Sequence, residues 1–209
     1  YVDPKPLTPE EDYAFDVGGF LVVPGVLTAV QVDACNKAID AGALDGQPDR
    51  SDLLKDLACL QDHPVLGRYL DQLTFDGYYV DRSIHLVDPT DSPTLSGGNE
   101  PRQPARTYYH QNEVRFAQGI IAIWALTDVE EGDGGFVLVP ASHKSSVETP
   151  SDLLDGTDDL DLVLQLPLRA GDLLLCVESV LHGVKPWRLT ASRRLVALTF
   201  AAEQAQRLD

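Results

Sequence analysis

The spacing of apolar residues changes along the chain from a helical period to a strand-like one. Thr8 precedes Pro9 and two acidic residues, an arrangement typical of the first turn of a helix. A short apolar run follows at 19–24, and from Thr28 onward apolar residues recur at helical spacing. Further helices are predicted from Ser51 through Leu60 and from Pro64 onward.

From residue 76 the pattern is one of short apolar or alternating segments, as in strands. Strands are predicted at 78–87, 119–126, 136–139, 162–168, 172–176 and 195–201, with long loops at 89–106 and 149–161. A loop as long as the first is often a lid or a binding segment. Helices followed by many short strands predict an α+β, mainly β chain, a sandwich or barrel with helices packed on one side. We expect a single domain over 1–209, mainly helical in 1–75 and a β core in 76–209.

The chain is acidic, with 33 Asp and Glu against 16 Lys and Arg among 209 residues, for a formal net charge of −17. This balance argues against nucleic acid as a partner, because phosphate binding needs a basic surface. No apolar run approaches the roughly 20 residues that span a bilayer, and no signal-peptide pattern opens the chain. The chain begins at Tyr1 rather than methionine, so we expect a segment to precede it.

The cysteines point to a reducing compartment. Cys35, Cys59 and Cys176 are odd in number, widely spaced and without a CxxC pair. They predict reduced core cysteines in a cytoplasmic protein rather than a disulfide framework or a zinc site.

Two histidines and an arginine have settings that suggest metal chemistry. In an extended segment, residues i and i+2 point to the same side, so His110 and Asn112 can present two ligands to one ion. His182 lies at the end of a later apolar strand, and Arg193 opens the final strand. Two histidines and a carboxylate hold Fe(II) with positions left open for a 2-oxo acid and O₂. A guanidinium such as that of Arg193 then binds the far carboxylate of the co-substrate.

Four motifs, in order along the chain, resemble the phytanoyl-CoA dioxygenase family of iron- and 2-oxoglutarate-dependent oxygenases. They are the opening Gly19–Leu27, the central run from Thr127 through Gly134–Phe136 to Pro140–Lys144, the turn Ala170–Asp172, and His182-Gly183 followed by Arg193. The resemblance implies a double-stranded β-helix core, jelly-roll or cupin-like, with the N-terminal helices on one side. It also implies a non-haem Fe(II) dioxygenase that uses 2-oxoglutarate and O₂ to hydroxylate a small organic substrate.

The resemblance also carries residue roles onto this sequence. His110, Asn112 and His182 would be the catalytic iron ligands. Arg193 would hold the distal carboxylate of 2-oxoglutarate, in preference to the arginine that follows it, and Gln111 would face the co-substrate.

The departure from the family pattern is Asn112, which stands where the family has an aspartate. A neutral amide oxygen binds a hard cation more weakly than a carboxylate does. Three interpretations follow: a natural variant with altered metal binding, an engineered trap, or a relative that has lost catalysis and binds a metabolite. A different class, a sugar-binding β-sandwich, would make both histidines incidental.

Two further residues are candidates for substrate contact. Trp187 lies in a loop beyond the second histidine ligand, and Glu178 lies shortly before that histidine. We expect His85, His143 and Trp124 to have structural roles and His63 to lie at the surface.

Overall fold

Two antiparallel sheets face each other in the computed structural model, which describes residues 7–44, 57–74, 77–86, 94–101, 103–111, 114–188 and 193–203. The larger sheet has the order β1-β9-β6-β11-β2, with bounds Phe20–Val23, Leu173–Val177, Gly119–Ala125, Leu195–Ala202 and Tyr78–Leu86. The smaller sheet has the order β3-β10-β7-β8, with bounds Leu95–Ser96, Leu181–Lys185, Gly135–Val139 and Leu164–Gln165. A separate hairpin pairs β4 (Tyr108–Gln111) with β5 (Val114–Ala117).

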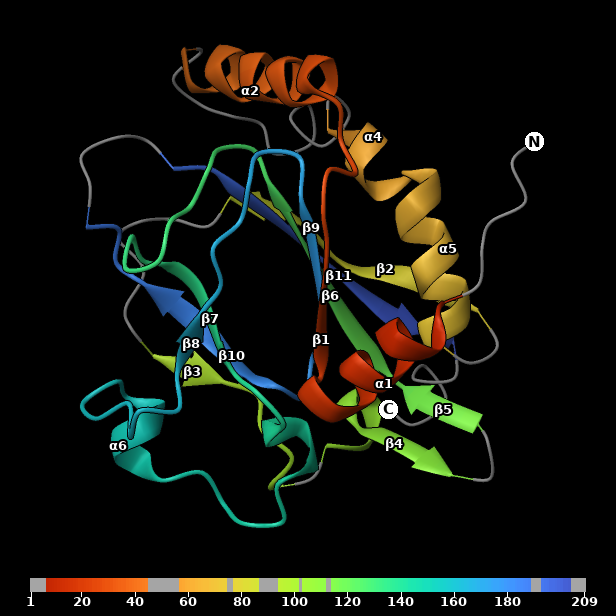
Figure 1. Ribbon diagram of the computed structural model, residues 1–209, viewed down its shortest axis with the longest axis vertical. Coiled ribbons are helices and arrows are strands. Elements are labelled where there is room, and N and C mark those ends of the chain that lie inside the picture. Colours follow the sequence, from red (N-terminus) through yellow and green to blue (C-terminus); the bar gives the residue numbers. More distant parts are fainter. Residues whose placement is uncertain are drawn as a thin grey trace.

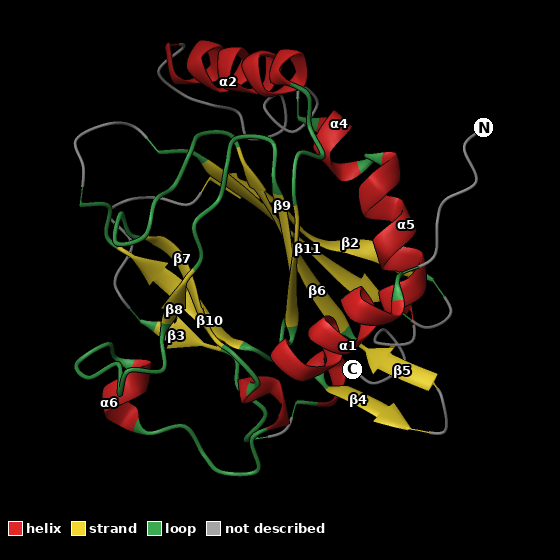
Figure 2. Ribbon diagram, in the orientation of Figure 1, coloured by secondary structure: helices red, strands yellow, loops and turns green. Residues whose placement is uncertain are grey.

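Three N-terminal helices lie on the outer side of the larger sheet: α1 (Pro9–Gly18), α4 (Ala58–Gln61) and α5 (Pro64–Leu73) (Figures 1 and 2). The helix α2 (Ala29–Leu44) lies across the top end of the molecule in Figure 1, and the short α6 (Ser151–Leu154) lies beside the smaller sheet. Single 3₁₀ turns occur at η1 (Pro104–Arg106) and η2 (Ser142–Lys144). The jelly-roll fold class, mainly β with helices on one side, is confirmed. Within the described part of the chain, no helix is long and apolar enough to cross a membrane.

Local sequence signals explain where the helices begin. The Thr8 hydroxyl accepts a hydrogen bond from the Glu11 amide at 3.1 Å, and the Glu11 carboxylate accepts one from the Thr8 amide at 2.9 Å. This reciprocal capping box satisfies two amides that the first helical turn leaves unpaired. At the start of α5, the His63 imidazole accepts a hydrogen bond from the Val65 amide at 3.3 Å.

His63 is half-buried, and its ring meets the edge of Trp124 at 5.4 Å, so our expectation of a surface position is wrong. Trp124 lies in the core as predicted. The helix predicted to start at Ser51 is described only at its end, because 51–56 lie outside the described residues.

Most predicted strands are confirmed, and four details of the predicted strands and loops differ. The segment predicted at 162–168 pairs only at Leu164–Gln165, and the acidic loop at 149–161 contains α6. The described part of the loop at 89–106 contributes β3 and η1. The apolar run before His182 is divided by a turn at 178–180 into β9 and β10, so His182 lies near the start of a strand rather than at its end.

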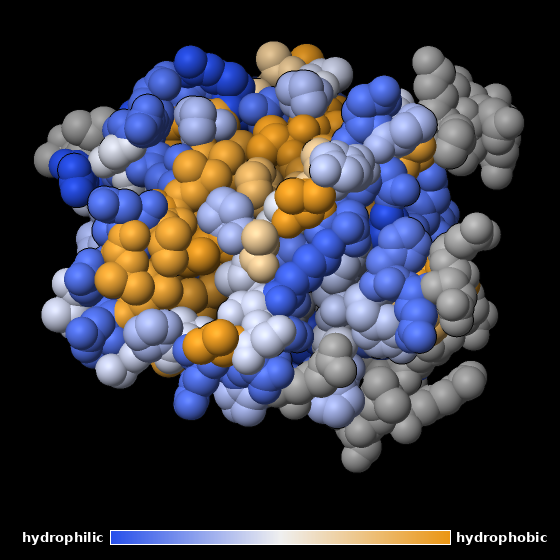
Figure 3. All heavy atoms as spheres, turned by 60° about the horizontal axis from the view of Figure 1, so that its bottom comes forward, coloured by the Kyte–Doolittle hydropathy of each residue, from blue (hydrophilic) through white to orange (hydrophobic). Residues whose placement is uncertain are grey.

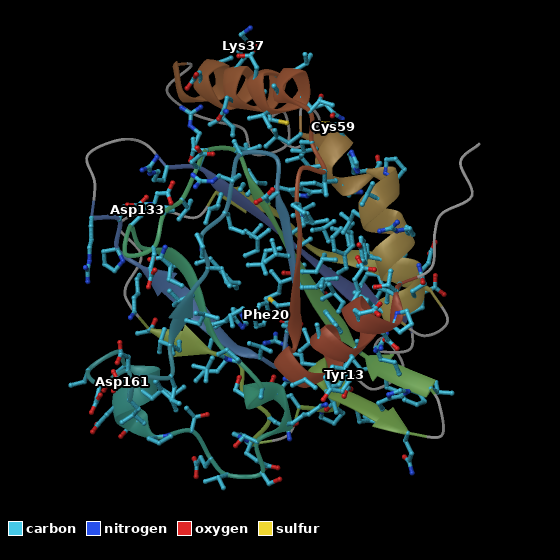
Figure 4. The ribbon with its side chains drawn as sticks, viewed as in Figure 1. Tyr13, Phe20, Lys37, Cys59, Asp133 and Asp161 are labelled. Carbon is cyan, nitrogen blue, oxygen red and sulfur yellow. The ribbon has the colours of Figure 1, made fainter. Side chains whose placement is uncertain are left out.

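The core lies on both faces of the larger sheet. Its outer face packs Trp124, Leu198 and Phe200 beneath α4 and α5, where Leu66 and Leu70 are also fully buried. Burial of each such side chain contributes roughly 1.5–3 kcal/mol. The inner face points toward the smaller sheet, and Phe20 of β1 projects into the space between the sheets (Figure 4).

The three cysteines are free, and Cys35 and Cys176 are buried as predicted, but Cys59 is exposed, so its predicted core position is wrong. Burial raises the pKa of the Cys176 thiol, and the nearby charge of Glu178 acts in the same direction. The Cys176 side chain is therefore a neutral thiol that packs like a small apolar group.

Candidate active site

His182 faces the space between the two sheets. In β10 it pairs with Leu138 of β7, and paired residues in an antiparallel ladder point to the same side. Leu138 belongs to the main core, whereas the flanking Leu181 and Val137 belong to a smaller cluster on the opposite face of this sheet. The alternation along β10 therefore directs the half-buried imidazole of His182 inward.

Two contacts help to orient the His182 ring. Its Nδ1 lies 2.7 Å from the carbonyl oxygen of Val180, and since a carbonyl oxygen only accepts, Nδ1 is the nitrogen that carries the hydrogen. The ring also stacks on Phe136 with centroids 5.9 Å apart. In the neutral ring, Nε2 then carries the lone pair. Histidines that bind metals commonly donate their other N–H to a backbone carbonyl in this way.

A glycine allows the chain to approach this histidine closely. At Gly97, φ is +95°, and an added Cβ would lie 2.5 Å from the Val180 carbonyl oxygen and 3.2 Å from His182 Nδ1. Any larger residue at this position would disturb the hydrogen bond that orients the ring. The loop at 89–106 thus contributes directly to the surroundings of His182.

Arg193 lies just before β11 as a nearly buried cation, its side chain 19% exposed. One guanidinium nitrogen forms an ion pair with Asp133 at 3.0 Å, while its Nε is buried without a hydrogen-bond partner. A buried donor left unpaired costs roughly 1–3 kcal/mol, so the geometry favours an additional acceptor at this position. Arg194 points elsewhere, toward the Asn36 carbonyl at 3.1 Å and Asp40 on α2.

Trp187 borders a groove beside the smaller sheet. Its indole is half-buried against the main core, and its Nε1 is buried without a hydrogen-bond partner. The groove has a volume of about 530 Å³ and is also lined by Leu164, Gln165 and Lys185. This volume lies within the range of small-molecule sites, roughly 300–1,000 Å³. Apolar residues also form a continuous area on one face of the molecule (Figure 3).

His110 and Gln111 lie on the β4–β5 hairpin and are exposed. His110 pairs with Arg115, whose guanidinium forms an ion pair with Asp12 of α1. This pairing pins the hairpin against α1 and places His110 near Asp16. Asn112 lies outside the described residues.

Beside His110, burial and hydrogen bonding act in opposite directions on the pKa of Asp16. Burial would raise it, but hydrogen bonds from Lys144 at 2.6 Å and Tyr108 at 2.6 Å hold it below its ordinary value. The charges of Lys144 and His110 act in the same direction as these hydrogen bonds. Burial raises the pKa of the Tyr108 hydroxyl, so it stays a neutral donor.

His143 is structural, as its position in the turn predicted. It is fully buried, and its Nε2 donates to the Asp16 carbonyl oxygen at 3.1 Å. Burial lowers the pKa of its imidazole, so the ring is neutral near pH 7. It packs edge-on against Tyr108 at 5.0 Å and thereby joins α1 to β4.

Glu178 is buried at the end of β9 and forms an ion pair with Arg106 at 3.3 Å. Within the described residues, no three His, Cys, Asp or Glu side chains gather closely enough to hold a metal ion. Sequence reasoning missed Asp133, the partner of Arg193. The only available signal was an acidic residue in the glycine-rich turn that precedes β7.

Comparison with known proteins gives a family and a fold. The family model for phytanoyl-CoA dioxygenase (PhyH) matches residues 15–195. HygX from Streptomyces hygroscopicus, solved with nickel and 2-oxoglutarate bound, superposes with a TM-score of 0.76 at 24% identity, over 94% of this chain and 88% of that one. No relative matched in a search of curated proteins.

Two structures from nogalamycin biosynthesis share the fold more distantly. The epimerase SnoN, in complex with Fe³⁺, α-ketoglutarate and nogalamycin RO, gives a TM-score of 0.65 at 17% identity, over 92% of this chain and 82% of that one. The α-ketoglutarate-dependent carbocyclase SnoK gives 0.62 at 19% identity, over 96% and 87%. The fold is thus that of the iron and 2-oxoglutarate-dependent enzymes, whose members include more than hydroxylases.

Proposed function

Because this chain belongs to the phytanoyl-CoA dioxygenase family, we propose that it is a non-haem Fe(II) and 2-oxoglutarate-dependent dioxygenase that hydroxylates a small organic substrate. The observation that carries the proposal is the inward-facing His182, whose Nδ1 donates to Val180 and whose lone pair therefore lies on Nε2. That arrangement suits a ligand for a divalent metal ion. We also propose that 1–209 forms a single domain and acts in the cytoplasm.

Three residues would hold the iron in this proposal: His110, Asn112 and His182. It requires the β4–β5 hairpin and β10 to present their histidines to a common point. Asn112 would contribute a neutral amide oxygen in place of a carboxylate, so we expect weaker binding of Fe(II) than in a protein with the full triad. The bound metal with 2-oxoglutarate and O₂ would supply the oxidising chemistry.

The co-substrate would be anchored by Arg193. Its guanidinium is the basic group that an acidic chain needs to bind a dianion, and the unpartnered Nε supports this role because it offers a buried N–H to a carboxylate. Gln111 would provide a further polar contact to the co-substrate.

The substrate would lie against Trp187, in or beside the groove that this residue borders. Glu178, which pairs with Arg106, is the second proposed contact. HygX with hygromycin B and SnoN with nogalamycin RO are structures with small organic molecules bound, which supports this substrate class.

The rival function is a non-catalytic member of the fold that binds a metabolite, and the observation that favours it is Asn112. Metal content separates the two. Purified parent protein, His182→Ala, His110→Ala and Asn112→Asp are dialysed anaerobically against Fe(II), and bound iron is measured. The proposed function predicts iron in the parent, less iron in both alanine variants and more in Asn112→Asp.

Turnover provides the second half of the test. Iron-loaded parent protein should convert 2-oxoglutarate to succinate in the presence of O₂, and His182→Ala should not. Parent protein that binds no iron and forms no succinate, while Asn112→Asp does both, supports the rival. A sugar-binding protein would retain ligand binding after His182→Ala, and neither histidine variant would change its metal content.

A further inference from the structure

Asp133 is held in place by its own turn before it meets Arg193. Its carboxylate accepts a hydrogen bond from the Glu130 amide at 2.9 Å, and its own amide donates to the Glu130 carbonyl at 3.1 Å. Its side chain is 10% exposed. The carboxylate is therefore a fixed acceptor rather than one of the adaptable ion-pair partners common on protein surfaces.

The turn that carries Asp133 is also hydrogen-bonded to the segment that carries Trp187. The Arg188 amide donates to the Asp133 carbonyl oxygen at 2.8 Å. The two residues after Asp133 are glycines, and an added Cβ at Gly135 would lie 2.3 Å from the Trp187 ring. Figure 4 shows Asp133 on this turn beside the smaller sheet. The Asp133 carboxylate thus pairs with the guanidinium that we assign to the site, and the turn that carries it packs against the Trp187 segment.

The contact between Asp133 and Arg193 leaves the guanidinium with donors to spare. Its Nη2 lies 3.0 Å from the carboxylate, and its Nε is buried without a hydrogen-bond partner. A guanidinium presents five N–H donors in a plane, so one carboxylate can fix the plane while a second binds another edge. Asp133 is placed to do the first, which leaves the second for a ligand.

We propose that Asp133 is a positioning residue that holds the Arg193 guanidinium ready for the distal carboxylate of 2-oxoglutarate. The proposal rests on the proposed function and deepens it. Without Asp133, a long and flexible side chain would adopt several orientations, and ligand binding would have to order it again. The sign of the effect is diagnostic, because removing a negative charge beside an anion site would by charge alone strengthen binding.

The test measures 2-oxoglutarate affinity in the Fe(II)-loaded protein by anaerobic titration of the visible absorption of the chelate. Asp133→Asn keeps the size of the side chain and removes its charge. Asp133→Ser is the second variant, since a hydroxyl can still accept from the Glu130 amide but does not reach Arg193. Glu131→Gln is the matched control, because it removes one exposed charge from the same turn. Thermal unfolding establishes that each variant is folded.

The expected result is a dissociation constant for 2-oxoglutarate raised roughly three- to tenfold in both Asp133 variants, the range for ordering one long side chain on binding. Glu131→Gln should match the parent. Binding of 2-oxobutyrate, which lacks the distal carboxylate, should be unchanged in every variant. A general loss of structure would instead weaken the binding of 2-oxobutyrate as well. Turnover at saturating 2-oxoglutarate should be unchanged while its KM rises.

Two kinds of failure are distinguishable through Arg193→Gln. If that change weakens 2-oxoglutarate binding but the Asp133 variants bind it equally well or more tightly, the clamp stands and the positioning role is overturned. If Arg193→Gln has no effect, or the parent forms no chelate, the assignment of the co-substrate site fails, and the role of Asp133 fails with it.

Discussion

Replacing Gly134 by alanine should destabilise the protein far more than the same change at Gly132. Both glycines have a left-handed backbone, with φ of +96° and +85°, and both amides donate to the Gln165 side chain, at 3.1 Å and 2.9 Å. They differ in their surroundings. An added Cβ at Gly134 would lie 2.2 Å from the Pro186 carbonyl oxygen, whereas nothing lies within 4 Å of one at Gly132.

The magnitude follows from two separate costs. A left-handed conformation costs an alanine roughly 1–2 kcal/mol, and both variants bear it. Gly134→Ala must also move the backbone of Pro186, and overpacking of this kind costs about 1–3 kcal/mol more. The free energy of unfolding should therefore fall by about 2–5 kcal/mol in Gly134→Ala and by about 1–2 kcal/mol in Gly132→Ala.

Urea denaturation of the two variants and the parent gives the free energies directly, provided that the slope with denaturant is unchanged. Equal losses in the two variants would show that the turn does not press against the Trp187 segment. The packing that we use to place Asp133 and Trp187 side by side would then be incorrect.

Three further predictions concern the helices and the core around the site. Tyr108→Phe removes a hydrogen bond to a charged acceptor, Asp16, and should lower the free energy of unfolding by about 1.5–3 kcal/mol in urea denaturation. Tyr109→Phe, on the other face of the strand, should lower it little, and equal effects would contradict the assigned bond. Because burial lowers the folded-state pKa of His143, its contribution to stability is complete above about pH 6.5 and is lost as the pH falls through the folded value. Urea midpoints at pH 7.5 and 5.5 should therefore fall more steeply with acid in the parent than in His143→Gln, and parallel pH dependences would refute this linkage. Leu198→Ala, in the fully buried centre of β11, should cost about 2–5 kcal/mol by thermal and urea unfolding, and a loss below about 1 kcal/mol would contradict its packing.

The sequence predicted best where one local signal determines the structure. The capping pair Thr8 and Glu11 marks the start of α1 because each side chain satisfies an amide only three residues away, and Pro9 at the first helical position has no amide to satisfy. The apolar runs of β6, β9 and β11 were equally clear, since strands covered on both faces have no polar side to alternate with. Fold class followed from the order of these elements and from the resemblance to the family.

Prediction was weaker where pairing between distant residues decides the outcome. The register of β4 with β5 aligns His110 with Arg115, and Arg115 forms an ion pair with Asp12, which lies on a helix 103 residues earlier in the chain. No local pattern indicates such a contact. For the same reason, charge alone suggested a buried arginine at Arg193 but not its fixed partner, Asp133.

The prediction of the strand boundary at His182 was wrong for another reason. Residues 173–182 are mostly apolar, and an apolar run shows no period that separates one long strand from two short ones. The turn at 178–180 follows from tertiary contacts, including the Glu178 amide bonded to the Gly119 carbonyl oxygen at 2.8 Å. The register of β10, which begins after this turn, directs His182 inward, so the site depends on a feature that hydrophobic patterning does not reveal.

The central claim is that His110, Asn112 and His182 hold Fe(II) in a site that chelates 2-oxoglutarate. The most direct measurement is an anaerobic titration of metal-free parent protein with Fe(II) and 2-oxoglutarate, observing the visible charge-transfer band of the chelate, with His182→Ala and Asn112→Asp in parallel. We predict a band in the parent, none in His182→Ala, and tighter iron binding in Asn112→Asp. A band in Asn112→Asp alone would identify the parent as a disabled member of the fold. The absence of the band from both the parent and Asn112→Asp, or an undiminished band in His182→Ala, would contradict the assigned centre.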